Sequence, residues 1–153
     1  MAGFTLTTRI AAPPETVFDV SLDIDLHQES MAGSGERAVA GVTSGRMGPG
    51  DTVTWLARHY GVRWRMTSRI SAYERPGYFV DEQVRGPFAR WHHAHHFAPD
   101  GAGGTVMRDV VDFSAPLGPL GRIAERIALG RYMPRLIRVR NAYVREAAEQ
   151  GRA

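Results

Sequence analysis

The segment FARWHHAHHFAPDGAGGTVMRDVVDFS, residues 88–114, contains two stretches in which side chains of opposite character alternate on either side of a glycine-rich turn. Alternation with a period of two is typical of a β-strand that buries one face. The sequence PDGAGG between the two stretches predicts a tight reversal of the chain. We therefore expect residues 88–97 and 105–114 to form neighbouring antiparallel strands.

The same alternation recurs along the chain and predicts further strands at residues 3–11, 36–42, 51–59, 62–73 and 78–85. An apolar stripe after Pro13 and Pro14 predicts one or two short helices over about residues 14–30. Residues from about 119 to 149 predict a long terminal helix, which Pro134 should kink or divide after Gly130. The expected apolar side of this helix consists of Leu120, Ile123, Ile127, Met133, Ile137 and Val144.

This order of elements predicts the fold class. Consecutive strands joined by short turns favour an antiparallel sheet, and one long amphipathic helix must then cover a face of that sheet. A chain of 153 residues is long enough for one hydrophobic core and too short for two. We predict a single α+β domain, residues 1–153, with a sheet of about seven strands.

Composition narrows the function classes. No run of residues approaches the roughly 18 apolar positions of a membrane-spanning helix. The N-terminal sequence lacks the basic start and apolar core of a signal peptide, so we expect a cytoplasmic protein without a membrane span. The absence of cysteine excludes disulfides, thiol nucleophiles and cysteine-ligated metals.

The basic residues are all arginine. The chain contains 19 of them and no lysine, which is typical of codon usage in a GC-rich bacterial genome. They are spread from Arg9 to Arg152, and the formal net charge is only +3, so we predict no nucleic-acid binding. A weaker alternative is an interaction module whose arginine-rich C-terminal helix docks an acidic partner.

Several segments together resemble the START-like superfamily, also called SRPBCC, which includes polyketide cyclase/dehydrase and lipid-transport proteins. These segments are IAAPPETVFDV (residues 10–20), FVDEQVRGPFARWHHAHHF (79–97) and GGTVMRDVVDFSAPLG (103–118), followed by a long last helix. The resemblance implies a helix-grip fold, in which a curved sheet wraps the C-terminal helix around a deep apolar cavity. Members bind lipids, sterols, polyketides or hormones, and a minority catalyse cyclisation or dehydration. The superfamily has no universal catalytic motif and usually no metal.

Strand alternation divides the HHAHH sequence between two faces. Trp91 and Phe97 share a parity with His93 and His95, so this set is expected to face the cavity, and His92 and His96 to face solvent. Apolar alternation in residues 105–114 likewise turns Met107, Asp109, Val111 and Phe113 inward. The parity of residues 79–85 stays open, and with it the direction of Asp81 and Gln83.

The inward pair has three interpretations. In the first, Asp109 and the histidines form a structural network that satisfies buried polar atoms. In the second, His93, His95 and Asp109 act as catalytic acid and base. In the third, the histidines bind a metal with His59 or Asp109 as a third ligand. Because H-x-H is common by chance, we predict neither a metal nor another cofactor.

The function we predict is binding of a hydrophobic small molecule in the internal cavity, by a monomer or a homodimer. The alternative is a polyketide or aromatic cyclase or dehydratase that uses the same cavity, and the sequence leaves open whether the protein is an enzyme. In the superfamily that this chain resembles, the glycine-rich loop at residues 44–51 often borders the cavity mouth, so the resemblance implies that Met47 could form part of a gate there. The predicted ligand-binding residues are Trp55, His59, Trp64, Met66, Phe79, Asp81, Gln83, Trp91, His93, His95, Met107, Asp109, Val111, Met133 and Ile137.

Overall fold

The computed structural model describes residues 2–151 and contains one seven-stranded antiparallel sheet. Its strand order is β1-β7-β6-β5-β4-β3-β2, so neighbours in sequence pair throughout except that β1 joins the far edge of β7. The predicted α+β architecture is therefore confirmed. The strands are β1 (Ala2–Ile10), β2 (Arg37–Gly41), β3 (Thr52–His59), β4 (Val62–Glu74), β5 (Tyr78–Arg85), β6 (Arg90–Pro99) and β7 (Thr105–Ser114).

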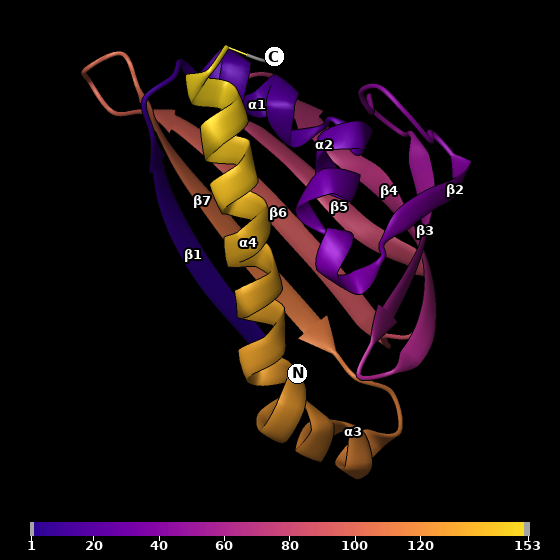
Figure 1. Ribbon diagram of the computed structural model, residues 1–153. Coiled ribbons are helices and arrows are strands. Elements are labelled where there is room, and N and C mark those ends of the chain that lie inside the picture. Colours follow the sequence, from indigo (N-terminus) through magenta and orange to yellow (C-terminus); the bar gives the residue numbers. More distant parts are fainter. Residues whose placement is uncertain (1, 152–153) are drawn as a thin grey trace.

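The two short helices after β1 and the long C-terminal helix lie on one face of the curved sheet (Figure 1). Helix α4 (Gly130–Glu149) runs along this face beside β1 and β7, and the short helices α1 (Pro14–Ser21) and α2 (Ile24–Ser30) lie next to it. A proline begins α1, and the Asp23 carboxylate begins α2 by accepting a hydrogen bond from the Leu26 amide at 3.0 Å. This arrangement is the helix-grip fold predicted from the resemblance.

Two groups of buried side chains hold the helices to the sheet. In the first, the ring of Phe18 on α1 packs edge-to-face against Tyr73, Phe79 and Phe97. The second lies toward the other end of α4, where Met133 packs near Phe113 and its neighbours. Aromatic side chains of this size bury large apolar areas, so these two groups fix the helix layer at both ends of the sheet.

The beginning of the terminal helix differs from the prediction. Leu120, Ile123 and Ile127 were expected on its buried side but are 68%, 53% and 72% exposed. The reason is that α3 (Gly118–Ala124) and the turn that follows it, which contains Ile127, lie beyond the end of the sheet, where no strand covers them (Figure 1). Met133, Ile137 and Val144 are buried as predicted.

The division of this helix also falls slightly earlier than predicted. A π-helical turn, η2 (Glu125–Leu129), separates α3 from α4, and Pro134 lies inside α4. The Glu125 carboxylate anchors the turn by accepting a hydrogen bond from the Ala115 amide at 2.9 Å. None of the helices within residues 2–151 is long and apolar enough to cross a membrane.

Candidate functional site: a cavity that ends in a buried polar cluster

A cavity of about 160 Å³ lies between the sheet and helices α2 and α4. Its wall is mostly apolar, with Trp55 and Trp64 on the strands and Ile137 on α4 among the lining side chains. Apolar walls of this kind provide most of the binding free energy in small-molecule sites, while a few polar groups fix orientation. Met47 also lines the cavity and is 7% exposed.

Most of the predicted ligand-binding residues reach this cavity. They come from four strands and from α4. The sequence left open which face of β5 points into the cavity, and the structure shows that it is the face with Phe79 and Asp81. The predicted residues that line the cavity are Trp55, His59, Trp64, Met66, Phe79, Asp81, Trp91, His93, His95, Met133 and Ile137.

Four predicted residues lie elsewhere. Met107 and Val111 have the inward parity but are fully buried against neighbouring side chains, because β7 lies beneath α4. Gln83 instead holds the loop before β6, where its side chain exchanges two hydrogen bonds with the Phe88 backbone at 2.8 and 3.1 Å. Asp109 is fully buried and lies behind the histidines without lining the cavity.

The sheet register brings two histidines and two carboxylates together. Asp81 on β5 is directly opposite His93 on β6, and His95 on β6 is directly opposite Asp109 on β7. Because His93 and His95 are two residues apart on one strand, all four side chains lie on the inner face. We call these four residues the buried polar cluster.

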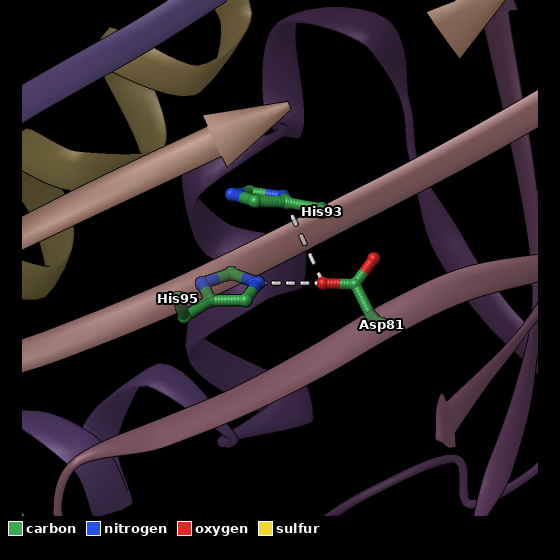
Figure 2. A group of neighbouring side chains, drawn as sticks. All are labelled: Asp81, His93 and His95. Carbon is green, nitrogen blue, oxygen red and sulfur yellow. Dashed lines mark hydrogen bonds and ion pairs between the residues drawn. The ribbon is translucent and has the colours of Figure 1, made fainter. Parts of the chain in front are cut away.

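The hydrogen bonds of the cluster run along its diagonals. His95 Nε2 lies 2.6 Å from Asp81 Oδ2, and His93 Nε2 lies 2.8 Å from Asp109 Oδ1. The two imidazole rings stack with their centroids 3.7 Å apart but point in opposite directions, His95 toward Asp81 and His93 away from it toward Asp109 (Figure 2). His95 also stacks on the ring of Phe79 at 4.1 Å. Diagonal neighbours in a sheet are within reach of such long side chains, so the register alone sets up this geometry.

Helix α4 covers the buried polar cluster on the side that faces away from the sheet. Asn141 donates a hydrogen bond to Asp109 Oδ2 at 2.7 Å, and Arg140 Nη1 lies 3.4 Å from Asp109 Oδ1. Arg140 further donates to the Asn141 side-chain oxygen and to the Ser21 carbonyl, and its guanidinium borders the cavity. Asp109 therefore has a charged and a neutral donor from the helix in addition to His93.

The environment sets the charges of these groups. Burial acts to raise the pKa of Asp109, but hydrogen bonding to His93, the nearby His95 and the charge of Arg140 hold the pKa well below its usual range. Burial also opposes ionisation of Asp81, yet the neighbouring histidines and Arg140 lower the pKa of that carboxyl. Burial and the adjacent His95 lower the pKa of His93, which favours a neutral ring. At neutral pH the site thus contains two ionised carboxylates and a neutral His93.

Two further histidines border other parts of the cavity. His59 Nδ1 shares a hydrogen bond of 2.6 Å with the Tyr132 hydroxyl, and burial lowers the pKa of His59. His27 Nε2 lies 2.7 Å from Glu36 Oε1, and its ring packs on Trp55. The ligand atoms that lie within 4.8 Å of one another belong to Asp81, His93 and His95, so the structure does not place His59 as a third metal ligand beside the two histidines.

Sequence reasoning found the apolar residues that α4 contributes but missed its polar ones. Arg140 and Asn141 were not predicted, although they lie between Ile137 and Val144, which are buried on the same helix. Helical spacing places residues three and four apart on one face, so two polar residues at these positions are the signal that could have identified them. Tyr132, also on α4, was missed in the same way.

The chain was compared with known proteins. It matches the family described as polyketide cyclase/dehydrase and lipid transport over residues 1–149. A search of curated protein sequences finds no match. Among solved structures, a protein from Thermus thermophilus superposes with a TM-score of 0.79 at 16% identity, covering 99% of this chain and 100% of that one.

The names of two other similar structures state a superfamily or an activity. A START superfamily protein from Mycobacterium smegmatis has a TM-score of 0.69 at 16% identity, with 97% of each chain covered. The Zhui aromatase/cyclase from Streptomyces sp. R1128 has a TM-score of 0.68 at 15% identity, with 98% of each chain covered. Identities this low establish the shared fold only. The family match over nearly the whole chain shows that this protein belongs to the polyketide cyclase/dehydrase and lipid transport family.

Proposed function

We propose that this protein binds a hydrophobic small molecule in the cavity between the sheet and α4. The observation that carries the proposal is the division of the cavity wall. Most of the wall is lined by tryptophan, methionine and aliphatic side chains, and at one place Asp81, the two histidines of the buried polar cluster and Arg140 gather on it. Such a wall suits a ligand with an apolar body and one oxygen-bearing group.

The size of the cavity limits the part of the ligand that it can enclose. An engineered protein cavity of about 150 Å³ accommodates benzene, so about 160 Å³ fits a ring-sized apolar group. Burial of apolar surface contributes roughly 25 cal/mol per Å², so a ring-sized group supplies several kcal/mol before any polar contact is made. The polar contacts would then select among ligands of similar size.

Titration with an environment-sensitive apolar dye tests this proposal. Saturable binding at one site is expected, and it should weaken at least about tenfold, or about 1.4 kcal/mol, when Ile137→Trp fills the cavity. Val139→Trp is the matched control, because Val139 is on the same helix and 43% exposed. Equal dye binding by both variants would contradict a ligand site in this cavity.

A second candidate function is catalysis of a cyclisation or dehydration. It is favoured by the His93–Asp109 hydrogen bond, since a carboxylate that orients an imidazole is a common acid–base arrangement, and one similar structure is an aromatase/cyclase. Under this alternative, His93→Ala should abolish turnover of a bound polyketone while leaving its affinity within a few-fold. Under the binding function, His93→Ala should weaken binding, and no turnover should be present in the unaltered protein.

A further inference from the structure

Three side chains at the cavity converge as metal ligands do. Asp81, His93 and His95 each offer one ligand atom, and the three atoms lie within 4.8 Å of one another. Asp81 Oδ2 is 2.6 Å from His95 Nε2 and 3.7 Å from His93 Nδ1 (Figure 2). Ligand bonds of about 2.0–2.2 Å hold the ligand atoms of a zinc-type site about 3–3.5 Å apart. These two separations are on either side of that range, and all three ligand atoms lie within 4.8 Å of one another, so side-chain rotations would bring them around one ion.

The hydrogen bond of His93 to Asp109 keeps the ring proton on Nε2, which leaves Nδ1 free to bind a metal ion. An ionised carboxylate only accepts hydrogen bonds, so His93 Nε2 must carry the proton that it shares with Asp109 at 2.8 Å. In the neutral ring, Nδ1 then has a free lone pair, and this is the nitrogen that faces Asp81. An imidazole held by a carboxylate on its far nitrogen is the usual outer-shell arrangement of metal-bound histidine.

A bound cation would change the hydrogen bonding of the His95 ring. Its Nε2 donates to Asp81, which leaves Nδ1 buried without a hydrogen-bond partner, one of two such side-chain nitrogens within residues 2–151. Nδ1 lies 3.3 Å from Asp109 Oδ1. If Nε2 coordinates a metal ion, the ring proton moves to Nδ1, and a rotation of the ring would then align it with this carboxylate. Coordination thus supplies the missing partner, and Asp109 then supports both histidines.

Charge and access also favour a cation. Two carboxylates, those of Asp81 and Asp109, border the two histidines, and the guanidinium of Arg140 lies 3.4 Å from Asp109 Oδ1, so carboxylates outnumber guanidinium groups in this cluster. Asp81, His93 and His95 all line the cavity, whereas Asp109 lies behind them. Two imidazoles and one carboxylate with an open side form a common ligand set for catalytic Zn²⁺ and for non-haem Fe²⁺.

We propose that Asp81, His93 and His95 bind one divalent transition-metal ion, with Asp109 as the outer-shell carboxylate that orients both imidazoles. The open side of the ion faces the cavity and takes an oxygen atom of the bound molecule, such as a carbonyl or enolate oxygen. The choice of that oxygen ligand rests on the proposed binding function, but the metal site itself does not.

The test uses tag-free protein, stripped with a chelator and titrated with Zn²⁺ and with Co²⁺. One equivalent of Zn²⁺ per chain should remain bound through gel filtration, and Co²⁺ should give the visible absorption bands of a site with protein nitrogen ligands. Asp81→Asn and His95→Gln should each weaken metal affinity by more than about 100-fold. Asp109→Asn should weaken it about 10–100-fold, as outer-shell changes do.

His92→Ala and His96→Ala are the matched controls, because these residues are on the same strand but on its other face. Both should leave affinity and stoichiometry unchanged. Circular dichroism of each variant establishes whether it is folded. If Asp81→Asn does not fold, the loss of metal affinity is judged from His95→Gln alone. Loss of metal binding in both folded variants, with both controls unaffected, supports the proposal.

Failure to retain Zn²⁺ or Co²⁺ in the folded, unaltered protein would overturn the proposal, as would retention that Asp81→Asn and His95→Gln do not change. Either result would assign the cluster to a purely structural network. Apolar dye binding by the metal-free protein separates this outcome from failure of the proposed function, since dye can bind the cavity in the absence of any metal.

Discussion

The two faces of strand β6 carry the same residue type in opposite settings. His93 and His95 are 4% and 2% exposed and are held between carboxylates of β5 and β7. His92 and His96, their immediate neighbours, are only partly buried on the other face of the sheet, where His96 packs on the ring of Tyr78. The sequence HHAHH is therefore two pairs, and only one of them belongs to the candidate site.

The difference shows that neighbours across the sheet decide what a histidine does. On the inner face, the register aligns Asp81 and Asp109 with the histidines, and Arg140 and Asn141 cover them. On the outer face, His92 is opposite Asp112 and His96 is opposite Arg108, and burial and the charge of Arg108 lower the pKa of His96. Substitutions at matched positions should therefore give unequal effects.

The largest difference in the loss of unfolding free energy is expected between substitutions of Asp109 and of Asp112. Asp109→Ala leaves Arg140 buried without its carboxylate, and breaking a buried ion pair costs about 3–5 kcal/mol. Asp112→Ala, on the outer face of the same strand, should change the free energy of unfolding by less than about 1 kcal/mol. Denaturant titration of both variants measures the difference, and equal losses would show that the inner network does not stabilise the fold.

A smaller difference in stability loss is expected between substitutions of His95 and His96, which lie on opposite faces of β6. His95→Ala removes a hydrogen bond to an ionised carboxylate and the ring that stacks on Phe79, which should cost about 2–3 kcal/mol. His96→Ala, on the outer face, should cost less than about 1 kcal/mol. Thermal unfolding of the two variants compares them, and a greater loss for His96→Ala would reverse the assignment of faces.

The smallest effect concerns an ion pair outside the cluster. Asp19 accepts two hydrogen bonds from Arg75, at 2.9 and 2.8 Å, and these bonds lower the pKa of Asp19. Because the folded pKa is below the unfolded value of 3.8, the pair stabilises the fold above that pH and loses its effect as the pH falls through the folded pKa.

The measurement is the free energy of unfolding of Asp19→Asn and of the unaltered protein between neutral and acid pH. The two should converge as the pH falls, and added salt should reduce their difference at neutral pH because the pair is at the surface. A difference that persists in acid would assign the effect of Asp19 to packing.

The strands could be predicted from the sequence because their alternation is local. Residues 78–85 and 105–114 were predicted with the bounds that the structure shows, and the inward parity of β6 was confirmed. The parity of β5 could not be predicted, because Phe79 and Val80 are both apolar and both are 2% exposed. Pairing with β6 decides it, since Asp81 is opposite His93.

The helix layer was harder to predict because its burial depends on where the sheet ends. Leu120, Ile123 and Ile127 have the spacing of a buried helix face but extend beyond the last strand. Arg140 and Asn141 have the spacing of buried residues but are polar, so a search for apolar stripes passed over them. Their role follows only from contact with Asp109, which is 31 and 32 residues away in the chain.

Native mass spectrometry of the freshly purified protein tests the central claim most directly, namely that the cavity holds a hydrophobic small molecule. The account predicts a bound organic molecule on the unaltered protein and on Val139→Trp, and its absence from Ile137→Trp. A folded protein that carries no organic molecule, and takes up none from lipid and polyketide extracts, would contradict the account.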